Sequence, residues 1–228
     1  MTIAVLIPAY NEEATIGNLV TKIKAIDSDL KIYVIDDGST DNTAINAQEH
    51  GAEVVRHPIN LGGGAAIRTG LTLCLLKEIK FAITLDADGQ HDPGEIPKLL
   101  ETIEREEAGL VVGSRFLKHN ELTMRRYRSI GVRFFSWCTS LLTGMQLTDA
   151  TSCYRVYDLD MIRGKIESLS ENQYYSIETL LRLAQAGAKI VEVEIQDIPR
   201  LQGSSKKGIL SYMYNLLRVI LRLTPQTL

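Results

Sequence analysis

Two aspartates stand two residues apart directly after an apolar run that is typical of a buried β-strand. The run is FAITL (residues 81–85), and DADGQ (residues 86–90) follows it. Open parallel sheets bind ligands at the carboxyl ends of their strands, so both carboxylates can face one crevice. With the amide oxygen of Gln90 they form a hard oxygen set suited to Mg²⁺ or Mn²⁺ bridging a diphosphate. For an isolated pair of aspartates, the alternative is a polar turn or a helix cap.

Polar groups also follow the two earlier apolar runs. PAYNEE (residues 8–13) comes after residues 3–7, and DDGST (residues 36–40) comes after residues 32–35. Tyr10 can stack on a base, and Glu12 or Asp36 can accept hydrogen bonds from ribose or base groups. Asp37 can help to set its turn. Carboxylates gathered on one rim repel each other, and a cation or hydrogen-bond donors must relieve that repulsion. This context favours ligand binding over a bland turn at residues 86–90.

A glycine run, NLGGG (residues 60–64), opens an expected helix. Helix N-termini bind anions through free N–H groups, so Gly62 and Gly63 are candidates for contacting a phosphate. A tight turn is equally consistent with the run. The dinucleotide fingerprint G-x-G-x-x-G fails because Ile67 stands where the third glycine belongs.

Strand-like and helix-like segments alternate through the first 112 residues. The expected strands are residues 3–7, 32–35, 53–55, 81–85 and 110–112, and the expected helices are residues 12–26, 64–76 and 95–103. This alternation predicts an α/β fold with a mostly parallel central sheet flanked by helices. Glu12 and Glu13 are expected in the first turn of the first helix, where its dipole favours negative charge.

The second half changes in texture. It offers a helix at residues 134–142, a strand at 153–157, a helix at 176–186, a strand at 190–198 and a largely apolar helix at 209–223 with a narrow polar stripe. Because no Pro/Gly/Ser linker separates the halves, we expect one domain over residues 1–207, in halves 1–113 and 114–207, followed by an amphipathic helix over 208–228.

Composition bounds the class of protein and its location. The 228 residues carry 25 Lys plus Arg against 28 Asp plus Glu, a net charge of −3 that argues against a general nucleic-acid binder. Three widely spaced cysteines favour a reduced intracellular protein. No signal-like segment or run of about 18 apolar residues is present, so we expect a cytoplasmic protein. Residues 209–223 either lie on the cytoplasmic membrane face or pack in the core or a dimer.

Other active-site patterns find no support. The four histidines show no HExxH spacing, and no GxSxG motif is present, which argues against a zinc enzyme and a Ser/His hydrolase. His91 follows the aspartate pair closely and can reach a phosphate, but we expect it to be a surface loop histidine.

Taken in order, the motifs resemble inverting family 2 glycosyltransferases of the GT-A fold. The motifs of the first half are PAYNEE, DDGSTDNT, NLGGGAAIRTG, LDADGQHDP and VGSR; those of the second are Arg126, Arg128, Ser129, DATSCYR (149–155), Glu178 and RLQGSSK (200–206). The second set is similar to the dolichyl- or polyprenyl-phosphate mannosyl- and glucosyltransferase branch. The resemblance covers nearly all of residues 2–207. It implies a GT-A domain with a nucleotide-sugar half and an acceptor half.

The resemblance also implies a reaction and a set of site residues. The reaction is transfer of a hexose (mannose or glucose) from a GDP- or UDP-sugar to a polyprenyl or dolichyl phosphate, with Mg²⁺ or Mn²⁺. The implied residues are Pro8, Tyr10, Glu12 and Asp37 around the nucleoside; Asp86, Asp88 and Gln90 on the metal; and Arg115, Arg128, Arg200 and Lys206 around phosphates. Two features depart from the family: Cys153 stands where Gly is frequent, and the C-terminal membrane-spanning helices of some members are missing.

The chemistry explains why such residues are needed. A metal held by Asp86 and Asp88 stabilises the diphosphate leaving group. A lipid phosphate is already ionised near pH 7, so it needs cations for positioning and no base. The candidate catalytic residues are Asp88 on the metal, Asp149 as the base for a hydroxyl acceptor, and the cations that the resemblance places around phosphates, Arg128, Arg200 and Lys206.

Three alternatives remain open. A hydroxyl acceptor would need a carboxylate base, Asp149 or Glu178. A nucleotidyltransferase should show a GGxGTR-like loop where this chain has PAYNEE. A non-catalytic nucleotide-sugar-binding module would bind the donor without turnover, and the intact aspartate pair argues against it. The sequence predicts no oligomeric state.

Overall fold

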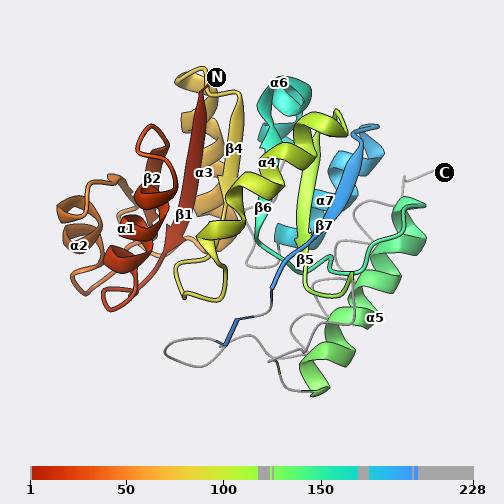
Figure 1. Ribbon diagram of the computed structural model, residues 1–228, viewed down its shortest axis with the longest axis horizontal. Helices are drawn as coiled ribbons and strands as arrows, with labels where there is room; N and C mark the ends of the chain where they lie inside the picture. The colour runs from red at the N-terminus through yellow and green to blue at the C-terminus, as the bar shows by residue number, and fades with distance from the viewer. Residues whose placement is uncertain (1, 118–123, 125, 169–174, 197, 200–228) are drawn as a thin grey trace.

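The computed structural model describes residues 2–117, 124, 126–168, 175–196 and 198–199 (Figure 1). The strands are β1 (Ile3–Ala9), β2 (Lys31–Asp36), β3 (Glu53–Arg56), β4 (Phe81–Thr84), β5 (Leu110–Ser114), β6 (Arg155–Asp158) and β7 (Ile190–Glu194). The helices are α1 (Ile16–Ile26), α2 (Thr43–Glu49), α3 (Gly63–Leu76), α4 (Ile96–Arg105), α5 (Arg126–Thr143), α6 (Leu159–Ile162) and α7 (Tyr175–Gln185), with 3₁₀ turns at Pro93–Glu95 and Arg163–Ser168.

The described strands form one seven-stranded sheet in the order β3-β2-β1-β4-β6-β5-β7. Every neighbouring pair is parallel except those of β6, which runs antiparallel to both β4 and β5. A strand from the second half of the chain is thus inserted between two strands of the first half. The predicted α/β fold with a mostly parallel sheet is confirmed.

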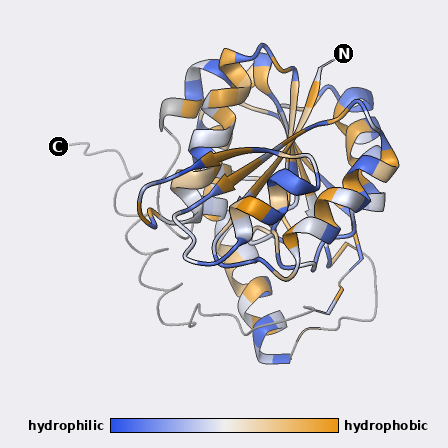
Figure 2. Ribbon diagram, turned by 90° about the vertical axis from the view of Figure 1, so that its left-hand side faces the viewer, coloured by the Kyte–Doolittle hydropathy of each residue, from blue (hydrophilic) through white to orange (hydrophobic). Residues whose placement is uncertain are grey.

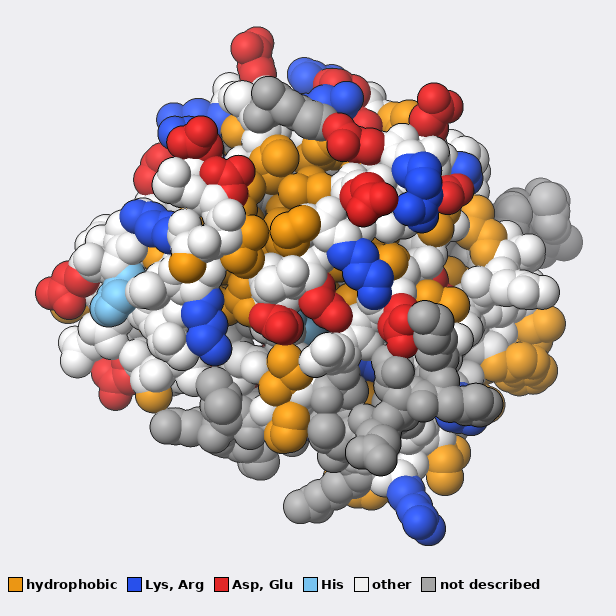
Figure 3. All heavy atoms as spheres, in the orientation of Figure 1, with side chains coloured by type: hydrophobic (Ala, Val, Ile, Leu, Met, Phe, Trp, Pro, Cys, Tyr) orange, Lys and Arg blue, Asp and Glu red, His pale blue; other side chains and the backbone are white. Residues whose placement is uncertain are grey.

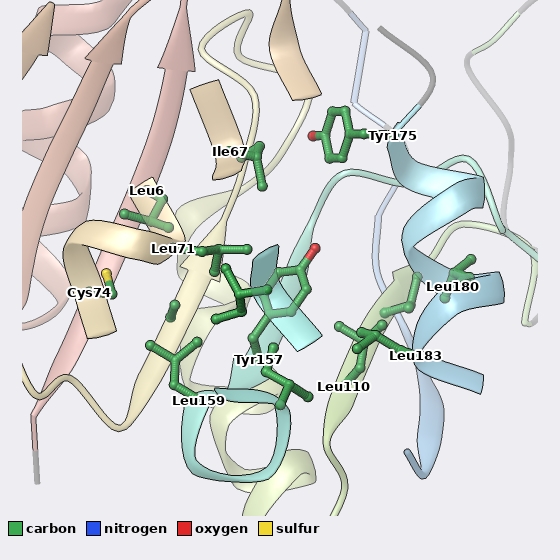
Figure 4. Close-up of a cluster of buried hydrophobic side chains, with 14 of the residues drawn as sticks. Leu6, Ile67, Leu71, Cys74, Leu110, Tyr157, Leu159, Tyr175, Leu180 and Leu183 are labelled. Carbon is green, nitrogen blue, oxygen red and sulfur yellow. The ribbon is translucent and has the colours of Figure 1, made fainter. Parts of the chain in front are cut away.

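Helices cover both faces of this sheet. The apolar residues of α1 and α4 pack on one face, and those of α3 and α7 pack on the other. Figure 2 shows the hydrophobic strands enclosed between these helical layers. In Figure 4, side chains of α3 and α7 converge on Tyr157 of β6 from opposite sides. The sheet therefore lies between two separate hydrophobic cores.

The central strand β1 shows why the sequence requires two covered faces. Ala4 and Leu6 enter one core, Val5 and Ile7 enter the other, and all four are fully buried. A strand buried on both faces has a continuous apolar run, as found in parallel sheets. Truncating Leu6 to Ala would cost about 2–5 kcal/mol of folding stability.

Three predicted boundaries were wrong. The first helix begins at Ile16 because the chain first makes a turn in which the Glu12 carbonyl accepts from the Thr15 and Ile16 N–H groups. Glu12 and Glu13 therefore precede the helix. The helix predicted at residues 134–142 begins at Arg126, and the last described strand ends at Glu194.

The predicted C-terminal helix (residues 208–228) lies outside the described residues. Within the described part of the chain, no helix is both long enough and apolar enough to cross a membrane.

Candidate functional site

The strand order creates a crevice at one edge of the sheet. From β1 the chain passes to β2 on one side, and it later returns to place β4 on the other side of β1. Ligands of open α/β sheets bind at such a switch point, outside the carboxyl ends of the strands. The ends of β2, β1 and β4 lead into the three polar motifs, so the structure brings these motifs to one rim, as predicted.

The loops after β1 and β2 are tied together by hydrogen bonds. The Asn11 N–H donates to Ser39 Oγ at 2.9 Å, and the Thr40 N–H donates to Asn11 Oδ1 at 2.9 Å. The Glu12 N–H donates to Thr43 Oγ1 at 2.8 Å. Asn11 has a φ of 55°, which asparagine tolerates better than most residues. The PAYNEE and DDGST motifs thus form one unit.

The residues expected around a nucleoside stand on this unit. Tyr10 is 38% exposed, Pro8 is partly buried in β1, and Glu12 Oε2 accepts from Thr15 Oγ1 at 3.2 Å. Their contact with a nucleoside stays a prediction.

Asp37 is buried, and its carboxylate organises the segment that precedes α3. Oδ1 lies 2.8 Å from His57 Nδ1 and accepts from the Leu61 N–H at 2.9 Å, while Oδ2 accepts from the Gly62 N–H at 2.7 Å. The second ring nitrogen of His57 lies 3.0 Å from Thr69 Oγ1. Asp37 therefore joins the DDGST and NLGGG motifs. His57 was missed from the sequence, because nothing in its local context indicates this partner.

Two glycines permit the close approach of these motifs. Gly62 has a φ of 98° and donates its N–H to Asp37, while Gly63 begins α3. Gly38 has a φ of 75°, and a Cβ there would lie 2.6 Å from the carbonyl carbon of Ile59. Gly38 and Gly62 both have a positive φ, which glycine adopts more readily than other residues. Phosphate binding by Gly62 and Gly63 stays a prediction, and the Gly62 N–H is already engaged.

Asp36, at the end of β2, is fully buried and held by Arg56. Its Oδ1 accepts from the Ser39 N–H at 2.9 Å. Its Oδ2 lies 3.1 Å from Arg56 Nε and forms an ion pair with it, but the angle between the two groups does not suit a hydrogen bond. The same guanidinium donates to the Ser39 carbonyl at 2.6 Å. These contacts indicate a structural role for Asp36 at the turn.

The DADGQ loop carries the predicted metal ligands. Asp88 is 8% exposed, and its Oδ1 accepts from the Gln90 N–H at 3.0 Å. The Gln90 amide nitrogen lies 3.5 Å from the Ile198 carbonyl, so its amide oxygen faces elsewhere. Among the described residues, no group of three or more His, Cys, Asp or Glu forms a complete metal site. The loop offers instead two carboxylates and one amide oxygen.

His91 is buried beneath the DADGQ loop and accepts a hydrogen bond from it. The prediction of a surface histidine was therefore wrong. His91 is 6% exposed, and its Nδ1 accepts from the Asp86 N–H at 3.2 Å. Its ring lies 5.0 Å from that of Tyr154, whose hydroxyl donates to the Asp92 carbonyl at 2.9 Å. Burial raises the pKa of Tyr154, so the hydroxyl remains a donor. A tyrosine from the second half of the chain thus supports the aspartate loop.

Arg115 and Asp149, both in the second half of the chain, form a two-pronged ion pair. Arg115 Nε lies 2.7 Å from Asp149 Oδ2, and Nη2 lies 3.0 Å from Oδ1. Asp149 is fully buried, and its N–H donates to Glu192 at 2.8 Å. Burial raises the pKa of Glu192, although donors on residues 148 and 149 oppose that effect. Both carboxylate oxygens of Asp149 are thus engaged by Arg115. A contact of Arg115 with the donor phosphates stays a prediction.

The other candidates fall in different settings. Glu178 is buried on α7, and its Oε1 accepts from Arg182 Nε at 2.9 Å and Nη2 at 2.7 Å. Arg128 is exposed in the first turn of α5. Arg200 and Lys206 lie outside the described residues. Their grouping with Arg128 around a phosphate stays a prediction.

The burial of Arg155 was not predicted from the sequence. Arg155, the first residue of β6, is fully buried and donates to the carbonyls of Ser152 at 2.8 Å and Ala150 at 3.2 Å. Its Nη1 and the buried hydroxyls of Tyr157 and Tyr175 have no hydrogen-bond partner in the described structure. Figure 4 shows Tyr175 facing α3 across the end of the apolar cluster. A strand pattern predicts no such burial for an arginine.

The fold and the loops at the edge of the sheet indicate a class of protein, and comparison with known protein families identifies the family. An α/β domain with acidic loops at a β1/β4 switch point is a nucleotide-binding architecture. Residues 4–163 match the model of glycosyl transferase family 2. The chain belongs to this family and is a glycosyltransferase with the GT-A fold, as its sequence motifs indicated.

Two named relatives are sugar transferases whose names include a polyprenyl or dolichyl phosphate. The chain is 30% identical to undecaprenyl-phosphate mannosyltransferase of Micrococcus luteus, over 90% of this chain and 87% of the relative. It is 32% identical to UDP-N-acetylglucosamine–dolichyl-phosphate N-acetylglucosaminyltransferase of Methanococcus voltae, over 86% and 85%. Both names describe transfer to a lipid phosphate.

A solved structure shares the fold. Glucosyl-3-phosphoglycerate synthase of Mycobacterium tuberculosis, in complex with Mn²⁺, UDP and phosphoglyceric acid, superposes with a TM-score of 0.76 over 97% of this chain and 78% of that chain, at 21% identity. The same enzyme has been crystallised with Mg²⁺ and UDP, with a TM-score of 0.73, 22% identity and coverage of 97% and 78%.

Proposed function

We propose that this glycosyltransferase transfers a hexose, mannose or glucose, from a GDP- or UDP-sugar to a polyprenyl or dolichyl phosphate, with inversion at the anomeric carbon. The observation that carries the proposal is the state of the two carboxylates that could serve as bases. Asp149 and Glu178 are both buried and both held by arginines. A hydroxyl acceptor needs a base, whereas a lipid phosphate is already ionised. The lipid-phosphate acceptors named for the relatives support the same choice.

The DADGQ loop fits a divalent cation. Mg²⁺ commonly uses one or two protein carboxylates and completes its shell with substrate phosphates and water. Asp86, Asp88 and Gln90 supply that kind of oxygen set, and Gln90 already anchors Asp88 through its backbone. The Mn²⁺ and Mg²⁺ bound with UDP in the structural neighbour support the assignment. When bound, the cation would neutralise charge that develops on the leaving diphosphate.

The remaining chemistry falls to the chain's own residues. The nucleoside would sit on the interlocked loops, against Pro8, Tyr10 and Glu12, while Asp37 holds residues 57–62 in place. A phosphate oxygen of the acceptor attacks the anomeric carbon as the bond to the diphosphate breaks, and no proton has to be removed. Cationic positions, Arg128 with Arg200 and Lys206, would hold the acceptor phosphate through charge-assisted contacts. These residues act at the cytoplasmic membrane face.

A donor panel tests the proposal. Purified protein is incubated with detergent-dispersed polyprenyl phosphate, Mg²⁺ or Mn²⁺, and labelled GDP- and UDP-sugars in turn, and lipid-linked label is extracted and measured. We expect one donor to give product. Asp88→Asn should abolish transfer, whereas Asp160→Asn, at an exposed position of α6, should retain it. Failure of every donor with correctly folded protein would refute the proposal.

A further inference from the structure

Helix α5 presents an apolar stripe to solvent that neither core uses. Its members are Tyr127 (53% exposed), Ile130 (69%), Phe134 (45%), Trp137 (58%) and Leu141 (65%). They recur at steps of three and four residues, so at about 100° per residue they fall within an arc of about 80°. The stripe is about 21 Å long at 1.5 Å per residue. It is therefore a continuous surface along one helix.

The opposite side of α5 holds the helix to the protein. Phe135, Ser136 and Thr139 are buried there, and the Ser136 hydroxyl accepts from the Ala150 N–H at 2.9 Å. Helix α5 contacts α7. Helix α5 is therefore held to the rest of the protein by its buried side, and the apolar stripe takes no part in that packing. In Figure 3, hydrophobic side chains gather at the lower right, over α5 in the view of Figure 1.

Cationic side chains border the stripe along one side. At 100° per residue, Arg126 and Arg133 project about 20° and 40° beyond Trp137, at the edge of the stripe away from Tyr127, and both arginines are exposed. The Arg133 guanidinium also lies over the Phe116 ring, 5.5 Å from its centroid. A helix with aromatic and aliphatic residues on one face and arginines beside them has the pattern of helices that lie in the interface of an anionic bilayer.

We propose that the α5 stripe docks on the surface of a bilayer that contains anionic lipids. The proposal deepens the proposed function, since it rests on an acceptor that resides in a membrane. The arginines match anionic headgroups, and aromatic rings favour the boundary between headgroups and acyl chains. Arg115 and Asp149 bracket the segment that contains α5 and are joined by their ion pair. Docking through α5 would therefore place on the lipid surface the half of the chain, residues 114–207, that the resemblance assigns to the acceptor.

The protein carries its own reporter of this contact. Trp137 is the one tryptophan of the chain and lies on the stripe. Phosphatidylcholine vesicles with phosphatidylglycerol, free of donor and acceptor, should shift its emission to shorter wavelength, and brominated lipids should quench it. Vesicles of phosphatidylcholine alone should bind more weakly, and added salt should weaken binding to the anionic vesicles because it screens charge.

Matched variants locate the contact. Ile130→Ser with Phe134→Ser keeps Trp137 and should lower the vesicle partition coefficient at least about tenfold, because two apolar side chains lose their burial in lipid. Ile45→Ser with Leu76→Ser alters exposed apolar residues of α2 and α3 (54% and 78% exposed) and should leave partitioning unchanged. Circular dichroism and thermal melts are to be recorded for both double variants, to check that each is folded.

Three outcomes would overturn the docking proposal. One is no vesicle binding by the wild-type protein. Another is equal binding by the Ile130→Ser, Phe134→Ser variant, which would assign binding to another segment such as residues 209–223. The third is a Trp137 shift that grows with protein concentration without lipid, which would assign the stripe to a second copy. Sugar transfer to detergent-dispersed acceptor without vesicle binding refutes docking alone, whereas vesicle binding without transfer from any donor refutes the proposed function alone.

Discussion

Asp37→Asn should destabilise the protein even though it changes a single atom. The carboxylate faces three donors: His57 Nδ1, the Leu61 N–H and the Gly62 N–H. An asparagine amide keeps one oxygen and introduces an NH₂ group. In either orientation that NH₂ faces at least one backbone N–H, which loses its acceptor in a buried site. A hydrogen bond to a charged group contributes about 1.5–3 kcal/mol, so we expect a loss of about 2–3 kcal/mol.

Urea denaturation and thermal melting measure this loss. For a chain of this length the expected fall in Tm is roughly 5–10 °C. Asp29→Asn, at an exposed loop position, is the control and should change stability by less than about 0.5 kcal/mol. A double-mutant cycle with His57→Ala should show a coupling energy above about 0.5 kcal/mol, since the two side chains are in contact.

The same variants test how Asp37 serves the donor. If Asp37 acts by holding residues 57–62, Asp37→Asn and His57→Ala should both weaken the thermal shift produced by the donor. An Asp37→Asn protein of wild-type stability that had lost donor affinity would refute this reasoning and assign Asp37 directly to the nucleoside.

Three further predictions concern buried groups. Asp149→Asn should cost about 3 kcal/mol in chemical denaturation because it breaks the buried pair with Arg115; full stability with lost transfer would instead indicate a base. Burial raises the pKa of Cys74 to about 12. Alkylation of the native protein at pH 8, followed by mass spectrometry, should therefore find the Cys74 thiol unmodified. Alkylation of Cys74 as fast as that of part-buried Cys138 would contradict the prediction. Burial raises the pKa of Glu192, so the free energy of unfolding should fall as pH rises from about 4.3, the pKa of an unfolded glutamate, through the higher pKa of the folded protein. Glu192→Gln should remove this pH-dependent part of the free energy of unfolding. The same pH dependence of unfolding in the wild type and in the Glu192→Gln variant would show the assignment to be wrong.

Local sequence signals were sufficient wherever a pattern and its partner lie close in the chain. The apolar run of β4 is buried on both faces, and the aspartate pair after it reaches the predicted rim. Strand periodicity and the rule that parallel strands end at one edge predict that placement. The first helix begins four residues after its predicted start, because the N–H groups of Glu12 and Glu13 donate to side chains of the segment after β2. No local helix propensity encodes that contact.

The residues that were missed depend on long-range contacts. His57 meets Asp37 across 20 residues, and Tyr154 reaches the carbonyl of Asp92 across 62. Arg155 sits in a strand-like segment whose burial depends on how β6 is inserted between β4 and β5. The start of α5 was also missed because its first two turns place Tyr127 and Ile130 outward, where no apolar core pattern forms.

A competition between two acceptors tests the central claim most directly. Polyprenyl phosphate and the matched polyprenol are offered together, in detergent, with the labelled donor and Mg²⁺ or Mn²⁺, and mass spectrometry identifies the labelled lipid. Since Asp149 and Glu178 are both held by arginines, we expect label on the phosphate alone, as an acid-labile glycosyl phosphate. Label on the polyprenol hydroxyl would contradict it.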